Sequence, residues 1–141
     1  MLGTVYLANG KREEALPVHE RLAAVSPAWR GLVGVTYALV GDEAAARRRL
    51  EEQRDLHARA PTPWTAFTLT VLSAALGEAD EAALALAWEP HHAFLAWLAI
   101  EPLVAPLLEG RPAFEDMRRR LGLQEGSCCY RISLFGYPAA P

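Results

Sequence analysis

The fold is decided by the stretch GVTYALVGDEAAA, residues 34–46, because the chain contains the same frame a second time. Residues 3–15 read GTVYLANGKREEA, so a glycine, a tyrosine, a second glycine and an alanine recur in the same order and at the same spacing. A third, degenerate copy surrounds Gly77. The turn glycines Gly10, Gly41 and Gly77 follow one another at 31 and 36 residues, close to the ~34-residue period of a helix-turn-helix repeat. This repetition predicts stacked helix pairs.

Each position of the frame has a use in a helical hairpin. A glycine that ends the first helix can adopt the left-handed conformation that turns the chain, and acidic residues after it suit the positive end of the next helix. Small residues let helices approach closely, while the tyrosine fills the space between successive pairs. The residues expected to carry this packing are Gly3, Tyr6, Gly10, Ala15, Gly34, Tyr37, Gly41, Ala46, Gly77 and Ala82.

These stretches, residues 2–27 and 33–50 and more loosely 69–86, resemble the tetratricopeptide repeat (TPR) family. Residues 93–123 resemble the C-terminal cap that follows such repeats in many bacterial regulators. The resemblance implies an all-α fold of antiparallel helix pairs stacked in a right-handed superhelix. We expect about three pairs over residues 1–91, the first of them truncated, then a helical cap over 92–123 and a loosely ordered tail over 124–141.

The expected helices follow from the repeat and from the prolines and glycines that end each segment. The first helix lacks its N-terminal turn, because only Met1 and Leu2 precede Gly3. We therefore expect a fragment, a misassigned start or a contact edge. The helices are predicted over 1–9, 12–25, 29–40, 42–59, 64–76, 79–88 and 92–99, with one turn after Pro102 and a last helix from Pro112 to Leu121.

Composition limits the classes of function. Of the 141 residues, 52% are apolar and 22% charged, which excludes a disordered polar chain. The formal charge of −3 argues against a general nucleic-acid binder, and no uncharged run reaches the ~18 residues that would span a membrane. The adjacent Cys128 and Cys129 cannot staple the fold. We therefore expect a cytoplasmic protein that binds neither nucleic acid nor membrane.

Few residues suggest chemistry. Metal ligands on one helix face need a spacing of three or four residues, whereas His91 and His92 are adjacent and Pro90 predicts a bend. His19 is expected to be a packed or half-exposed core histidine, without a triad partner. We expect no catalytic residue, no metal and no cofactor. The alternative is a small zinc hydrolase or sensor domain using Glu89, His91, His92, His57, Cys128 and Cys129.

Two arginine clusters have structural explanations, and the first, residues 47–49, is interpreted as a solvated face with local ion pairs. Arg47 should pair with Glu51 and Arg48 with Glu52, one helical turn later. Residues 118–120, all arginine, should complement the dipole at the end of their helix. Binding of phosphate or an acidic peptide at either cluster is a minor alternative.

The TPR resemblance implies a concave groove lined by the first helix of each pair. It implies a non-catalytic protein-protein interaction module that binds an apolar or amphipathic peptide, or a neighbouring domain, within a larger bacterial signalling or regulatory protein. Alternatively, the cap helix around Trp97 fills that groove, or the chain is a self-assembling scaffold and homo-oligomer joined through its N-terminal edge. The groove positions are Leu7, Val35, Ala38, Leu39, Trp64, Phe67 and Val71.

Overall fold

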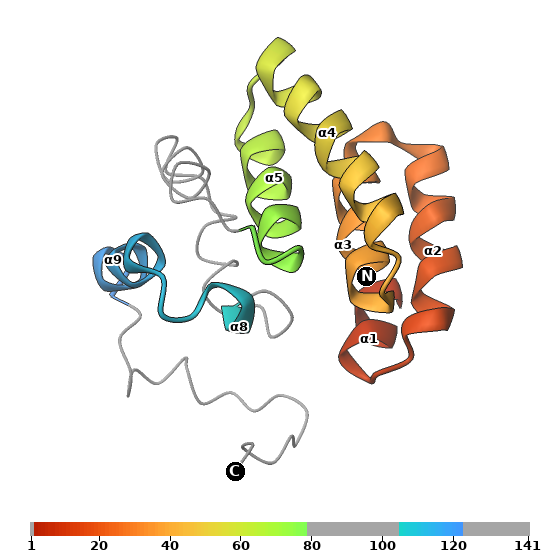
Figure 1. The fold of residues 1–141 in the computed structure, drawn as a ribbon, viewed down its shortest axis with the longest axis horizontal. Helices are drawn as coiled ribbons and strands as arrows, with labels where there is room; N and C mark the ends of the chain where they lie inside the picture. Colours follow the sequence, from red (N-terminus) through yellow and green to blue (C-terminus); the bar gives the residue numbers. More distant parts are fainter. Residues whose placement is uncertain (1, 79–104, 123–141) are drawn as a thin grey trace.

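The structure, a computed structural model, describes residues 2–78 and 105–122, and every regular element within these ranges is helical (Figure 1). The predicted all-α class is confirmed for this part of the chain. The helices expected over 79–88 and 92–99, Ala82 and the tail over 124–141 lie outside the described residues. The elements are α1 (Leu2–Ala8), α2 (Arg12–Val25), η1 (Pro27–Trp29), α3 (Arg30–Val40), α4 (Glu43–Arg59), α5 (Pro63–Ala75), α8 (Ala105–Leu108) and α9 (Pro112–Arg120).

The same turn follows α1, α3 and α5. The turn glycines Gly10, Gly41 and Gly77 have φ angles of 72°, 90° and 73°, the left-handed conformation in which glycine meets no steric penalty. At each turn the residue after the glycine donates its N–H to the carbonyl five positions earlier, as in a Schellman motif. The N···O distances are 2.8 Å for Lys11 to Tyr6, 2.9 Å for Asp42 to Tyr37 and 2.9 Å for Glu78 to Ser73. The three predicted turns are therefore confirmed as one repeated structure.

Small residues bring the helices together, as their place in the frame predicted. Ala15 and Ala46 are completely buried. A Cβ atom added to Gly34 would lie 2.7 Å from Leu72 Cδ2 and 2.8 Å from Arg49 Cβ. Gly34 thus gives α3 a close approach to its own partner α4 and also to α5, the first helix of the next pair.

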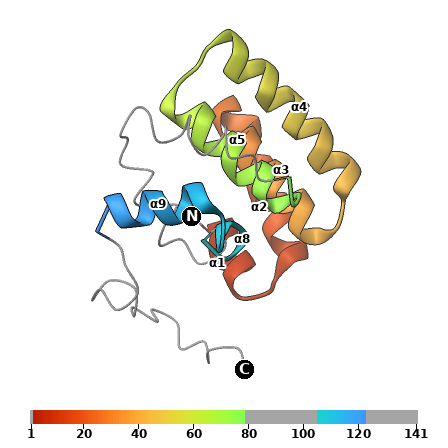
Figure 2. The ribbon, with the colours of Figure 1, turned by 60° about the vertical axis from the view of Figure 1, so that its left-hand side comes forward.

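Helix α3 lies at the centre of the described structure. It packs against α2, α4 and α5, while α1 packs on α2 and α8 on α5. Figures 1 and 2 show α1 to α5 side by side, with α8 and α9 beside α5. One hydrophobic core joins α3, α4, α5, α8 and α9, and its largest members are Val35, Leu50, Phe67, Val71, Leu72, Leu108, Phe114 and Met117.

Helix α5 has a closed N-terminus. Thr62 accepts a hydrogen bond at 3.1 Å from the backbone N–H of Thr65, and the Thr65 hydroxyl accepts one at 2.9 Å from the backbone N–H of Thr62. This reciprocal capping box satisfies two backbone donors that a helix start would otherwise leave without a partner. The buried Gln53 of α4 adds a link, because its Nε2 donates to Thr68 Oγ1 at 2.6 Å.

Candidate functional site

The predicted groove positions are mostly buried. Val35, Phe67 and Val71 are exposed by only 6%, 1% and 1% and belong to the core that also contains Leu108 and Phe114. They do not present the open apolar surface that the groove prediction requires, because apolar side chains of the segment after α5 share their cluster. The other groove positions range from buried to half-buried: Leu7 is buried, and Ala38, Leu39 and Trp64 are half-buried.

Trp64 is held by structural contacts. Its indole Nε1 donates to the carbonyl of Ala28 at 2.7 Å. Its ring lies edge-on to Trp29 at 5.1 Å between centroids and is stacked with Phe67 at 5.3 Å. These contacts join the start of α5 to η1. Trp64 therefore has a structural role, because it holds α5 against the segment that begins α3.

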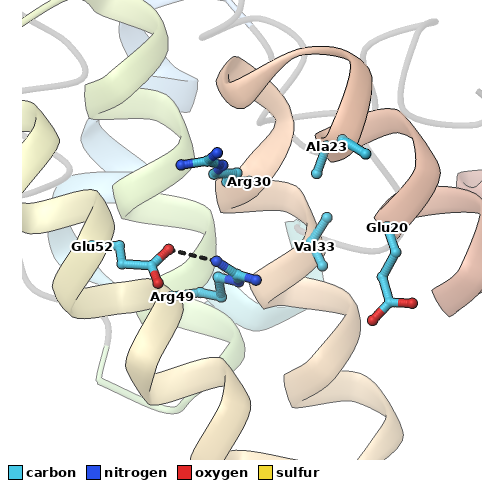
Figure 3. A pocket seen from close by; sticks show the side chains of 7 residues that line it. Glu20, Ala23, Arg30, Val33, Arg49 and Glu52 are labelled. Atoms are coloured by element: carbon cyan, nitrogen blue, oxygen red, sulfur yellow. Dashed lines mark hydrogen bonds and ion pairs between the residues drawn. The ribbon is translucent and has the colours of Figure 1, made fainter.

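The open site lies on the other side of α3. Successive residues of an α-helix are separated by about 100°, so Val33 and Val35 point to nearly opposite sides. On the Val33 side, α2 and α4 flank α3 and leave a hollow of about 440 Å³ (Figure 3). The residues that line this α2–α4 hollow are Glu20, Ala23, Ala24, Arg30, Val33, Arg49 and Glu52.

Three of the four charged residues in the α2–α4 hollow have partners. Arg49 pairs with Glu52 at 2.6 Å (Figure 3). Glu20 accepts a hydrogen bond at 2.5 Å from the Tyr37 hydroxyl, and this bond is the main reason why the pKa of Tyr37 is raised. Arg30 is exposed, and within residues 2–78 and 105–122 it has no ion-pair partner. The hollow therefore has a buried apolar floor at Val33. Its lining carries two acidic and two basic side chains, and among the described residues the Arg30 guanidinium has neither a hydrogen-bond nor an ion-pair partner, whereas the Glu20 carboxylate accepts one hydrogen bond from a neutral hydroxyl.

Sequence reasoning missed this hollow. Its one local signal is the pair Ala23 and Ala24, which are too small to fill the space between α2 and α4. The same small residues are frequent throughout this alanine-rich chain, so they do not single out a site.

The described histidines have structural roles. His19 is 5% exposed, and its Nδ1 lies 2.7 Å from Thr36 Oγ1. Because the Thr36 hydroxyl donates to the carbonyl of Leu32 at 3.2 Å, it accepts from the N–H of Nδ1. Burial lowers the pKa of His19 below its usual value of 6.5. The prediction of a packed core histidine is confirmed. His57 likewise lies 2.8 Å from Thr65 Oγ1.

The described ranges contain no group of three His, Cys, Asp or Glu side chains that could hold a metal ion. The zinc alternative is not tested by this, because Glu89, His91 and His92 lie outside the described residues, as do both cysteines. No helix in these ranges is long and apolar enough to cross a bilayer.

The two ion pairs predicted for α4, Arg47 with Glu51 and Arg48 with Glu52, are wrong. Arg47 pairs with Glu43, one turn before it, at 2.8 Å, and also with Glu78 after α5. A carboxylate placed four residues before a base is the better arrangement in a helix, which explains the choice of Glu43 over Glu51. The predicted partners of the α4 bases are taken by other arginines: Glu51 pairs with Arg54 at 2.5 Å and Glu52 with Arg49 rather than with Arg48.

The second arginine cluster occupies the last turn of α9, as predicted from its place before Gly122. Asp116 pairs with Arg119 at 2.9 Å and with Arg120 at 2.6 Å. Arg118 is buried, pairs with Glu115 at 3.2 Å and lies over the ring of Phe114. Besides their place at the end of α9, these arginines therefore form ion pairs within the helix, and Arg118 also packs in the interior.

No family model, curated protein or solved structure matches the chain.

Proposed function

We propose that the chain is a non-catalytic TPR-like interaction module that binds a segment of another protein. The three identical turns after α1, α3 and α5 support the repeat architecture, since each reverses the chain with the same hydrogen bonds. In this proposal α1 with α2 and α3 with α4 are successive helix pairs of a right-handed superhelix. Such arrays offer extended surfaces for protein partners. From the resemblance we further propose that the module belongs to a larger cytoplasmic regulatory protein of bacteria.

The observation that carries the proposal is the α2–α4 hollow. It is open to solvent, and its volume of about 440 Å³ falls within the ~300–1,000 Å³ typical of ligand-binding clefts. It combines an apolar floor with charged groups at its edge. In binding sites, apolar surface contributes affinity and a few polar groups fix the orientation of the ligand. The predicted groove is less suitable, because Val35, Phe67 and Val71 are already used by the core.

The chemistry of the described side chains also favours binding over catalysis. A general base must reach a proton that it can abstract, and its pKa should lie near the working pH. Here Nδ1 of His19 and of His57 is held by a threonine hydroxyl, and His19 is buried. Glu52 and Asp116 are held by neighbouring arginines. These side chains are engaged in stabilising the helices.

The proposal can be tested by selection from a displayed library of short random peptides on the immobilised full chain. We expect enrichment of peptides with a shared sequence pattern, and amide shifts on titration of one such peptide that centre on residues 20–24, 30–33 and 49–52. Shifts centred instead on Ala38, Leu39 and Trp64 would move the site back to the groove. Selection without a shared pattern, or equal binding to urea-unfolded protein, would contradict an interaction module.

A further inference from the structure

We infer that the α2–α4 hollow takes an acidic peptide segment, one of whose carboxylates pairs with Arg30. The inference rests on the proposed function and specifies its partner by chemistry: an aspartate or glutamate with small apolar neighbours.

Arg30 is the first reason. It lies at the edge of the hollow, is exposed, and has no ion-pair partner among the residues that the structure describes. Guanidinium is a planar group whose N–H donors match the two oxygens of a carboxylate, so an arginine in this position favours an acidic guest. A basic guest would have to compete with Tyr37 for Glu20 or with Arg49 for Glu52.

Arg49 is a second, recruitable base. Its pair with Glu52 joins two residues of one helix, and their side chains are 34% and 52% exposed. Exposed pairs of this kind are weak, because water screens the charges and both side chains lose conformational freedom. A carboxylate that enters beside Arg30 can therefore share or replace Glu52 as the partner of Arg49. Figure 3 shows Arg30, Arg49 and Glu52 on the same side of the hollow, with Ala23 and Glu20 on the facing helix α2.

The net charge of the chain, −3, does not attract an acidic guest, so the attraction must come from the arginines at the hollow. The apolar floor at Val33, with Ala23 beside it, offers a small apolar surface for the neighbours of the guest's carboxylate. The guest should therefore be an acidic residue within a slim, weakly apolar segment.

The test repeats the peptide selection with the wild-type chain, with Arg30→Gln and with Arg48→Gln. Arg48 is the matched control, because it is an exposed arginine on α4 that does not line the hollow. We expect peptides enriched on the wild type to share an aspartate or glutamate. In fluorescence polarisation with one labelled peptide, Arg30→Gln should weaken binding about tenfold, the effect of losing a charged hydrogen-bond partner, whereas Arg48→Gln should leave it unchanged.

Glu52→Gln gives a change of opposite sign. It removes the neighbour that competes for Arg49, so the same peptide should bind several-fold more tightly, and raised salt should reduce that gain. Thermal unfolding followed by circular dichroism checks that each variant is folded.

The outcomes separate the inference from the proposed function. Enriched peptides without a shared acid, or an equal loss in Arg30→Gln and Arg48→Gln, would overturn the acidic guest while leaving the interaction module in place. Failure to enrich any pattern would overturn both. If instead the chain dimerises on concentration and Arg30→Gln abolishes the dimer, the occupant is a second copy, and the inference of an acidic peptide partner is wrong.

Discussion

The two sides of α3 show how one helix can border both a closed core and an open site. On the side of Val35, α5 contributes Phe67 and Val71 and the later segment contributes Phe114, and these side chains fill the available space. On the side of Val33, the apolar side chains that α2 contributes are only those of Ala23 and Ala24, beside the exposed Glu20, and a hollow remains. The apolar positions of α3 are alike on both sides. What differs is the size of the side chains that face them.

This comparison changes how apolar positions in a helical repeat are interpreted. Side chains large enough to anchor a peptide are also large enough to bury against the chain's own helices, at about 25 cal/mol per Å² of apolar surface in either case. The first partner available is usually intramolecular. A site is left open where small residues prevent that contact.

The largest expected effect is on the closed side. Phe67→Ala should lower the free energy of unfolding by about 3–5 kcal/mol, because it removes a side chain that is 1% exposed and leaves a cavity between α5 and its neighbours. Urea denaturation followed by circular dichroism measures the change. Val25→Ala is the control, since Val25 is 85% exposed and its truncation should change stability by less than about 0.5 kcal/mol. Equal effects for the two variants would show that Phe67 is not a core residue.

A substitution at Gly34 tests the close approach of α3 to α4 and α5. Gly34→Ala should lose about 1–3 kcal/mol through overpacking against Leu72 and Arg49, offset in part by the gain of about 0.5–1 kcal/mol for alanine over glycine in a helix. The net effect should be destabilising in the same denaturation experiment. Gly41→Ala offers a comparison in which the added methyl meets nothing and only the left-handed φ of 90° is strained. A stabilised Gly34→Ala variant would mean that α3 and α5 do not lie this close.

His19 predicts a pH dependence at the α2–α3 contact. Burial lowers its pKa below the 6.5 of the unfolded chain, so the unfolded state takes up the proton first. Its contribution to stability is therefore complete above pH 6.5 and is lost as the pH falls from 6.5 towards the folded pKa. Urea midpoints measured across this range should fall more steeply for the wild type than for His19→Gln. Identical slopes for the two proteins would contradict a buried neutral histidine.

The smallest effect on stability is expected on the open side. Ala23→Leu should place apolar bulk in the α2–α4 hollow and change the free energy of unfolding by no more than about 0.5 kcal/mol, as for an ordinary surface change. It should nevertheless abolish binding of the selected peptide, measured by fluorescence polarisation. Val25→Leu, two residues later on the exposed surface of α2, is the control for binding. Undiminished binding to Ala23→Leu would place the site elsewhere.

The helices and turns were predictable because their signals are local. The pair Gly41 and Asp42 predicts a turn followed directly by a helix start, and the structure has that turn between α3 and α4. The burial of the groove positions was not predictable, because Phe67 and Phe114 belong to one core although they are far apart in sequence.

The ion pairs and the hollow show a further limit of sequence reasoning. Arg47 has carboxylates one turn away in both directions, and the choice between them is made by geometry and by Glu78. The hollow arises because α2 has no large apolar side chain that faces Val33. The absence of a large side chain does not produce a recognisable sequence motif. Both features become visible only when the helices are placed side by side.

The capping box at Thr62 has a consequence for the order in which the structure loosens. Helix α5 begins with its backbone donors satisfied and contacts α3, α4 and α8, whereas α1 has seven residues and leaves Leu2 and Val5 about half exposed. Local opening should therefore start at α1 and proceed inwards, so that amide protons exchange fastest there and slowest in α5. A partner bound between α2 and α4 would hold α2 against the rest of the structure. It would therefore slow the local opening of the α1–α2 hairpin without contacting α1.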